Sequence, residues 1–180
     1  MLKNLKFMGT DIHGFVEFRN KEKNEKEWHS FSYDELFLRR DYVMFYILAR
    51  VRPHAPHSFK PKGKIPVDEI SDCVKEARMF YIEDDIRYSS LRSCTLEDAL
   101  EYKKKYGCRI YKRDKKPYLV DDPDYHTDSW LSFSEYEQAL KYYTDYTKKK
   151  PFVDYVAVYE IMKVYENENY ETRFVYFFDN

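Results

Sequence analysis

Residues 173–179, RFVYFFD, limit the possible folds more than any other stretch of the chain. Five apolar or aromatic residues occupy the consecutive positions 174–178. Because side chains alternate between the two faces of a strand, such a run is typical of a strand that is buried inside a sheet. We therefore predict a central strand here, with the rest of the fold built around it.

A second strand is predicted over residues 7–19, where the pattern has a period of two. Ile12 and Val16 face one side of this strand, and Asp11 and His13 face the other. The other elements follow from local patterns: a charged hairpin connection at 20–27, a partner strand at 27–33, a buried helix at 41–52, helices at about 68–81 and 95–107, a short hairpin at 109–120, and a helix from the S-x-x-E capping box at Ser132 to about 147.

Residues 152–165 fit two structures, because the segment is apolar on nearly every side and contains enough β-branched residues for a strand. Its length favours a buried helix. With that assignment, the sequence predicts an α+β protein, a single domain with a mostly antiparallel sheet and helices packed on one face. Residues 53–66 hold four of the seven prolines and are predicted to form an ordered loop. Residues 83–120 are predicted to contain a helix and a basic hairpin.

Composition argues against several classes of protein. The net charge of -1 gives no global attraction to nucleic acid or anionic lipid, and the basic segment at 103–116 is too short to predict a nucleic-acid partner. No apolar run approaches the ~20 residues of a transmembrane helix. Three cysteines without a C-x-x-C pair argue against a disulfide framework or a zinc ribbon. We expect a cytoplasmic protein without a membrane partner, whose aromatic content suits a homo-oligomer.

The chain contains only four glycines, and two of them, Gly9 and Gly14, bracket Asp11 and His13. Alternation places these two polar side chains on one face, about 7 Å apart, where they could share a divalent metal or where Asp11 could orient His13 as a base. The glycines would leave room for a ligand or another backbone. The alternative is an edge strand whose two polar residues pair with neighbours, with a bulge at the glycines.

Basic side chains flank the predicted helix at 41–52. Arg40 precedes this helix, Tyr42 lies in its first turn, Arg52 ends it, and Lys62 follows in the proline-rich loop. Guanidinium forks match the oxygens of a phosphate or carboxylate, and tyrosine offers an aromatic face. These residues are therefore candidate contacts for a phosphate and a ring. Ordinary charge on a helix surface is the alternative.

Residues 121–131, DDPDYHTDSWL, are predicted to form an acidic loop before the capping box. Four aspartates surround His126, and Ser129 and Trp130 follow it. The D-x-D-x-D-G spacing of a calcium loop is absent, so a turn that merely solvates the connection is the alternative to a site. His126 and Trp130 would offer a base or a sugar a hydrogen-bond partner and a stacking face.

Several segments of the chain resemble a family of small phage and bacterial proteins that begin with M-G-T-D-I-H and end with F-D-N. The matching segments are MGTDIHGFVEFR at 8–19, RDYVMFYILARVR at 40–52, PKGKIP at 61–66, DYHTDSWLSFSEYE at 124–137 and RFVYFFDN at 173–180. The chain differs from the family in a lysine-rich segment around 83–120, which the resemblance implies is an insertion, and in Asp41, which replaces an asparagine. The resemblance implies a shared organisation, a helix at 152–165 and a phage origin, and hence the cytoplasm of a host cell.

One pocket is predicted if the first and last strands are neighbours. It would combine ten residues: Asp11, His13, Arg40, Tyr42, Arg52, Lys62, His126, Ser129, Trp130 and Asp179. These residues offer cations for phosphate, aromatic faces for a base and Asp/His groups for ribose hydroxyls. Walker, G-x-S-x-G, zinc-ligand and G-x-G-x-x-G patterns are all absent from the sequence. We therefore expect a binding protein without a cofactor, which holds a nucleotide-like molecule. The resemblance to phage proteins implies that it sequesters a signalling molecule of a host defence system.

Two alternatives belong to other functional classes. The first is a metal-dependent phosphoesterase or nuclease-like hydrolase with a divalent ion held by Asp11, His13, His126 and Asp179. The second is a protein–protein inhibitor that uses the tyrosine-rich surface. An enzyme would consume its ligand and need the metal, whereas a sequestering protein would return the ligand intact.

Overall fold

The protein was analysed as a computed structural model, which describes residues 9–52, 55–78, 81–83, 91–93 and 125–179. In chain order its helices and strands are β1 (Asp11–Asn20), β2 (His29–Ser30), α1 (Tyr42–Ala49), the short 3-10 helix η1 (Val67–Glu69), α2 (Asp72–Arg78), β3 (Tyr81–Glu83), β4 (Leu91–Ser93), β5 (His126–Ser132), α4 (Phe133–Thr147), α5 (Val153–Asn167) and β6 (Tyr170–Asp179). β3 and β4 form a separate two-stranded antiparallel sheet.

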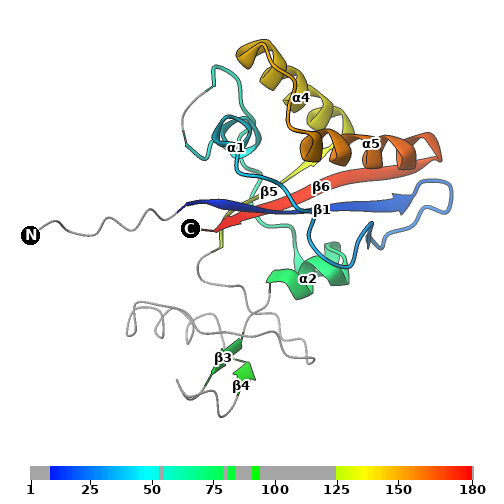
Figure 1. Cartoon of the computed structure of the whole chain (residues 1–180). Helices are drawn as coiled ribbons and strands as arrows, with labels where there is room; N and C mark the ends of the chain where they lie inside the picture. The colour runs from blue at the N-terminus through cyan, green and yellow to red at the C-terminus, as the bar shows by residue number, and fades with distance from the viewer. Residues whose placement is uncertain (1–8, 53–54, 79–80, 84–90, 94–124, 180) are drawn as a thin grey trace, which may run out of the picture.

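The main sheet has four antiparallel strands in the order β2-β1-β6-β5. β1 and β6 pair along their whole lengths, from Asp11 opposite Asp179 to Asn20 opposite Tyr170. Figure 1 shows the two strands side by side, with β1 beginning and β6 ending at the same end of the sheet. The predicted central strand is therefore confirmed, and so is the α+β class with its antiparallel sheet.

One face of the sheet packs against α1, α4 and α5 (Figure 1). Val16 of β1 and the rings of Phe174, Tyr176 and Phe178 of β6 are buried in this core. The spacing of two residues puts the three β6 rings on the same face. This core fixes the positions of the two paired strands relative to the helices.

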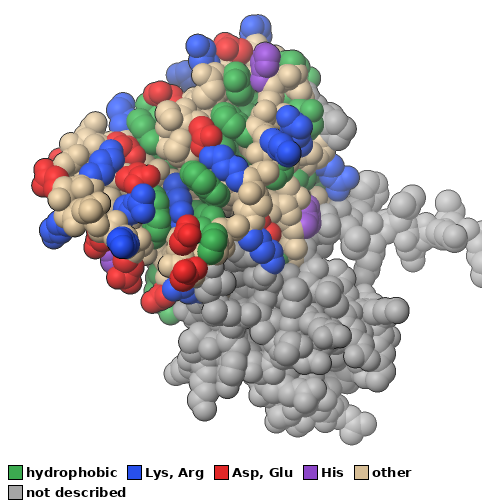
Figure 2. Space-filling model, turned by 180° about the vertical axis from the view of Figure 1, so that it is seen from behind, with side chains coloured by type: hydrophobic (Ala, Val, Ile, Leu, Met, Phe, Trp, Pro, Cys, Tyr) green, Lys and Arg blue, Asp and Glu red, His purple; other side chains and the backbone are tan. Residues whose placement is uncertain are grey.

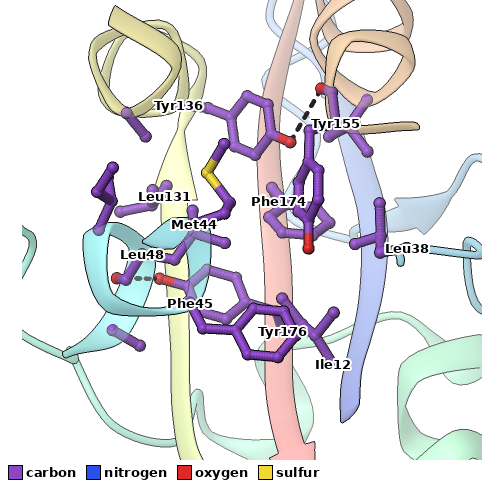
Figure 3. Packing of buried hydrophobic residues seen from close by; sticks show 14 of the residues in the cluster. Ile12, Leu38, Met44, Phe45, Leu48, Leu131, Tyr136, Tyr155, Phe174 and Tyr176 are labelled. Carbon is purple, nitrogen blue, oxygen red and sulfur yellow. Dashed lines mark hydrogen bonds between the residues drawn. The ribbon is translucent and has the colours of Figure 1, made fainter. Parts of the chain in front are cut away.

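The large tyrosines of this core keep their hydroxyl groups hydrogen-bonded, as buried polar groups must. Tyr136 of α4 donates to the backbone carbonyl of Tyr155 in α5 at 3.0 Å, and Tyr176 of β6 donates to the carbonyl of Leu48 in α1 at 2.7 Å (Figure 3). Leu48 lies in the last turn of α1, so the second bond satisfies a carbonyl that has no partner within the helix. These bonds fasten the helices to each other and to the sheet.

The opposite face of the sheet packs against α2. Phe15 of β1 and both Val175 and Phe177 of β6 meet Val74 and Ala77 of α2 in a second, smaller buried cluster. Three helices therefore lie on one face and α2 on the other, because β6 is apolar on both faces. None of the helices in the described part of the chain is long and apolar enough to cross a membrane.

Two predicted helices are confirmed closely, and a third is shorter than predicted. α4 begins at the predicted capping box, and both hydrogen bonds between Ser132 and Glu135 are present. The ambiguous segment at 152–165 is helical and forms α5. The helix predicted at 41–52 ends at Ala49, because Arg50 adopts a left-handed conformation with φ of 60° and its N–H donates to the Tyr46 carbonyl.

Three other predictions differ from the structure. The partner strand predicted at 27–33 is reduced to the two residues of β2, and the helix predicted at 68–81 is divided into η1, α2 and the start of β3. The loop predicted at 121–131 is wrong from residue 126 onward, where β5 forms an edge strand beside β6. The predicted elements at 95–107 and 109–120, and most of the predicted insertion, lie outside the described residues.

Residues 55–66 of the proline-rich segment contain neither helix nor strand and are fixed to the sheet and to α1. Phe59 N–H donates to the Ile47 carbonyl at 2.8 Å, and Gly63 N–H donates to the Asp128 carbonyl of β5 at 3.1 Å. Ile65 is buried. These hydrogen bonds attach the described part of this loop to α1 and β5.

Candidate functional site

The pairing of β1 with β6 brings three predicted residues to one end of the sheet. Asp11 lies directly opposite Asp179, and the Asp11 backbone N–H donates to Asp179 Oδ1 at 3.2 Å. His13 lies two positions along β1 and also reaches Asp179, so the two polar side chains share one face as predicted. Two carboxylates opposite each other in a ladder repel, so this end of the sheet needs cations.

Arg40 supplies the first cation. Its guanidinium binds both carboxylate oxygens of Asp11, from Nε to Oδ1 and from Nη2 to Oδ2, the latter at 2.6 Å. The hydrogen bonds with Asp11 raise the pKa of Arg40 further above its ordinary value, so the guanidinium stays charged. The side chains remain 51% and 47% exposed for Arg40 and Asp11. Because water reaches both groups, the partners of this fork can be exchanged at little cost.

The two glycines around this segment make room for different groups. A Cβ at position 9 would lie 2.1 Å from Nη1 of Arg40, so Gly9 allows the guanidinium to cross the chain there. A Cβ at position 14 would lie 2.5 Å from the buried ring of Phe174. Gly9 thus makes room for the Arg40 guanidinium, whereas Gly14 makes room for the Phe174 ring in the core.

Of the edge-strand alternative to a site, only the bulge is wrong, because the register between β1 and β6 runs unbroken through Gly14. β2 pairs with β1 only at Glu17 and Phe18, and both Asp11 and His13 pair with neighbouring side chains, as that alternative expects.

His13 supplies the second cation, between two carboxylates. Its Nδ1 lies 2.6 Å from Glu35 Oε2, and its Nε2 lies 3.4 Å from Asp179 Oδ2, a charge contact longer than an ordinary hydrogen bond. Burial lowers the pKa of His13, but Asp179 and Glu35 together outweigh burial and raise it from 6.5 to about 9. The ring is therefore an imidazolium at neutral pH and lacks the lone pair that a general base or a metal ligand needs.

Glu35 is a member of this site that sequence reasoning missed. It lies in the loop between β2 and α1, and a single β-bridge between Gly14 and Leu36 brings that loop alongside β1. No periodic pattern or motif marks Glu35 in the sequence. Its contact with His13 depends on the path of the loop, so a local signal could not have identified it.

Arg52 and Tyr42 extend the group toward α1. Arg52 Nη2 lies 3.4 Å from Thr10 Oγ1, and the guanidinium carbon lies 5.6 Å from the centre of the Tyr42 ring. After Asp11, Tyr42 and Asp179 also contribute to the raised pKa of Arg40, which places them near that guanidinium. We use the name sheet-end cluster for seven residues: Asp11, His13, Glu35, Arg40, Tyr42, Arg52 and Asp179.

Three other predicted residues form a second group around Lys62. The Lys62 ammonium lies 3.6 Å from the centre of the Trp130 ring and 2.6 Å from Glu135 Oε2, and the Lys62 backbone N–H donates to Ser129 Oγ at 3.1 Å. Glu135 belongs to the capping box of α4. These contacts attach the proline-rich loop to β5 and α4, which is a structural role for Lys62, Ser129 and Trp130.

His126, the tenth predicted residue, faces the other side of the sheet from His13. It pairs with Phe178 and stacks on that ring, with 6.1 Å between centroids, whereas His13 stacks on Phe177. His126 Nδ1 lies 2.7 Å from Thr127 Oγ1. Within the described residues, no group of three or more His, Cys, Asp or Glu side chains is arranged to hold a metal ion. This geometry gives no support to an ion shared by His13 and His126.

The charges of the sheet-end cluster are balanced. It contains three cations, Arg40, Arg52 and protonated His13, and three carboxylates. Arg40 and His13 contact the carboxylates, whereas Arg52 contacts Thr10 and Tyr42. Acidic and basic side chains are also interspersed over the described part of the face that Figure 2 shows. This face therefore presents no broad field of one sign to attract a polyanion. The arrangement suits a small ligand that exchanges contacts with individual groups.

Comparisons with known proteins do not assign the chain to a family. No protein-family model, curated protein or solved structure matches it.

Proposed function

We propose that the protein binds a nucleotide-like small molecule at the sheet-end cluster and holds it without changing it. The observation that carries the proposal is the half-exposed, two-point ion pair between Arg40 and Asp11. A guanidinium fork fits two phosphate oxygens as well as it fits a carboxylate. Because the pair is exposed, a ligand phosphate can replace Asp11 on Arg40 without burying an unpaired charge.

The neighbours of Arg40 support a ligand that carries a ring as well as a phosphate. Tyr42 is 37% exposed, so its ring offers a face on which a base can stack. Arg52 is a second exposed guanidinium, whose carbon lies 5.6 Å from the centre of the Tyr42 ring. A nucleotide would bring its phosphate to the arginines and its base to Tyr42.

The state of His13 supports binding over hydrolysis. Both of its ring nitrogens face carboxylates and the ring is charged at neutral pH, so it has no lone pair to accept a proton from water or to bind a metal. A hydrolase would need at least one such group beside the phosphate. In the sheet-end cluster His13 instead serves as a fixed cation that keeps Glu35 and Asp179 in place.

The biological role that we propose is sequestration of a signalling nucleotide inside a host cell. The resemblance of five chain segments to small phage and bacterial proteins supports this context. A sequestering protein needs affinity and slow release but no turnover, and the site offers charges that a ligand can exchange.

The test is to identify what the protein carries. Protein purified from a host is heated, and the released small molecules are identified by mass spectrometry. Three preparations are compared: wild type, Arg40→Ala and Arg19→Ala. Arg19 is the matched control, because it forms an ion pair with Glu171 through Nε and Nη2 near the other end of the same two strands.

We expect wild type and Arg19→Ala to release the same intact nucleotide, and Arg40→Ala to retain roughly 10- to 100-fold less, because it loses charge-assisted hydrogen bonds to phosphate. Equal release from both variants would exclude the sheet-end cluster as the site. Conversion of added nucleotide by the wild type in the presence of Mg²⁺ or Mn²⁺, abolished by a chelator, would overturn the proposal in favour of a hydrolase.

A further inference from the structure

We infer that Asp11 is a ribose-recognition residue, which takes the two adjacent hydroxyl groups of a ribonucleotide when the phosphate takes Arg40. The inference rests on the proposed function and specifies which nucleotides the site prefers. The basis is that a phosphate can bind Arg40 only by displacing Asp11, which then needs new hydrogen-bond donors. A carboxylate is acceptor-only when ionised and can receive two donors, one on each oxygen.

In the free protein both oxygens of Asp11 are satisfied by Arg40 alone, one by Nε and the other by Nη2. When a phosphate displaces Asp11 from the guanidinium, Asp11 loses both donors at once. Asp11 then stands opposite Asp179 in the ladder without its cation. Like charges directly opposite each other in adjacent strands are destabilising, so an anion that offers nothing to Asp11 binds against this repulsion.

Asp179 cannot relieve the repulsion by turning away. Its Oδ1 accepts the backbone N–H of Asp11 at 3.2 Å, and its Oδ2 lies 3.4 Å from Nε2 of His13. His13 is itself held at 2.6 Å by Glu35 on the other side of its ring. The neighbours of Asp179 and His13 therefore hold both side chains beside Asp11, and the donors that replace Arg40 on Asp11 come from water or from the ligand.

A ribose supplies donors of the right kind. Its 2′- and 3′-hydroxyls lie on adjacent carbons, and a carboxylate can accept from one or both, as acidic residues do in dinucleotide-binding proteins. A deoxyribose supplies one hydroxyl fewer, and inorganic phosphate or pyrophosphate supplies no sugar hydroxyl. The site should therefore rank ribonucleotide above deoxyribonucleotide, and both above a bare phosphate anion.

The experiment is isothermal titration calorimetry of the full chain with three probes: ADP, 2′-deoxy-ADP and pyrophosphate. We expect ADP to bind at least about 10-fold more tightly than 2′-deoxy-ADP, since a hydrogen bond to a charged group is lost. We expect pyrophosphate to bind more weakly than either nucleotide. Equal affinity for the two nucleotides would overturn ribose recognition and leave the proposed function standing. Binding of neither nucleotide would overturn both.

The variant Asp11→Asn separates recognition from a merely structural effect. It removes the negative charge and one acceptor while keeping the size of the side chain. We expect the ratio of affinities for ADP and 2′-deoxy-ADP to fall toward one, and the affinity for pyrophosphate to rise, because Arg40 is freed from its carboxylate. A uniform loss of affinity for all three probes, with the ratio unchanged, would overturn the inference. Arg19→Ala serves again as the control, and we expect its relative affinities for the three probes to equal those of the wild type.

Discussion

The paired strands β1 and β6 carry an ion pair toward each end, and the two pairs are built in opposite ways. Toward one end, Glu17 lies opposite Arg173, and the side chains are 0% and 7% exposed. At the other end, Arg40 and Asp11 are half exposed. The first pair is closed to solvent and the second is open to it.

Both oxygens of Glu17 and two of the three guanidinium nitrogens of Arg173 have protein partners. Glu17 Oε2 accepts from Nε of Arg173 at 2.7 Å, and Glu17 Oε1 accepts the backbone N–H of Ser71 at 2.7 Å. Arg173 also donates to the Glu69 carbonyl, and its guanidinium lies 3.8 Å from the centre of the Trp28 ring. Such a pair has no capacity left for a ligand, so its role is to join β1, β6 and the segment before α2.

Both ion pairs are charged, so charge alone does not distinguish them. Burial and the number of hydrogen bonds separate an ion pair that stabilises the fold from one whose groups can bind a ligand. Breaking a buried pair strands a charge in a medium that cannot solvate it. Breaking an exposed pair returns both groups to water, or to a ligand. The two ends of one strand pair can therefore be tested against each other.

The largest effect is expected at the closed end. Arg173→Met keeps much of the apolar stem but leaves the Glu17 carboxylate buried without its cation, which should lower the free energy of unfolding by about 3 to 5 kcal/mol. Urea denaturation followed by circular dichroism measures this change. Arg19→Met is the control, because its ion pair with Glu171 is partly exposed. A loss no greater than that of Arg19→Met would contradict the distinction between the two kinds of pair.

The next effect concerns the pH dependence of stability at the open end. The folded-state pKa of His13 is raised from 6.5 to about 9, so its contribution is fully present below pH 6.5 and is lost as the pH rises through about 9. The full contribution is on the order of 3 kcal/mol. Urea denaturation from pH 6 to 10 should show this decline for wild type and for His29→Gln, an exposed histidine that also contacts a glutamate. His13→Gln should lack it, and an unchanged slope in that variant would assign the decline to other groups.

The two glycines provide a smaller contrast. Gly14→Ala would bring a Cβ to within 2.5 Å of the Phe174 ring, which is enclosed by the core, so we expect a loss of about 1 to 3 kcal/mol from overpacking. Gly9→Ala meets only the end of the flexible Arg40 side chain, which can move, so its effect on the denaturation midpoint should be much smaller. Gly9→Ala should nevertheless weaken nucleotide binding, because it moves the guanidinium. Equal destabilisation by both substitutions would contradict the two roles.

The smallest effect on stability is expected for Arg40→Ala. Because both partners of its ion pair are half exposed, the thermal midpoint should fall only slightly, by the repulsion left between Asp11 and Asp179, while nucleotide release falls as described above. Differential scanning fluorimetry of Arg40→Ala beside Arg19→Ala measures this. A large drop in the midpoint for Arg40→Ala alone would show that the open pair is part of the fold.

The sequence predicted the elements that have a distinctive pattern within their own residues. The apolar run of β6 and the capping box of α4 each define their element without help from the rest of the chain. β5 was missed because it is an edge strand with polar residues, and its ladder is interrupted between His126 and Ser129. Thr127 has a φ of 55° at this point, which no alternation pattern can anticipate.

The candidate site was predictable where it depends on alternation within one strand. Asp11 and His13 share a face of β1, as their spacing requires, and the pairing with Asp179 follows once the two strands are neighbours. The same reasoning fails in β5. His126 and Trp130 are four positions apart and should share a face, but the interruption of the ladder places them opposite Phe178 and Val175, on different faces.

The pairing of β1 with β6 also determines when the site comes into being. Asp11 and Asp179 are 168 positions apart. On a ribosome that adds about 5 to 20 residues per second, β1 waits roughly 10 to 30 s for the strand that completes its ladder. Closing so long a loop is entropically costly and slows folding. The sheet-end cluster therefore assembles only after β6 has been synthesised, so occupancy by a ligand would mark chains in which β1 and β6 have paired.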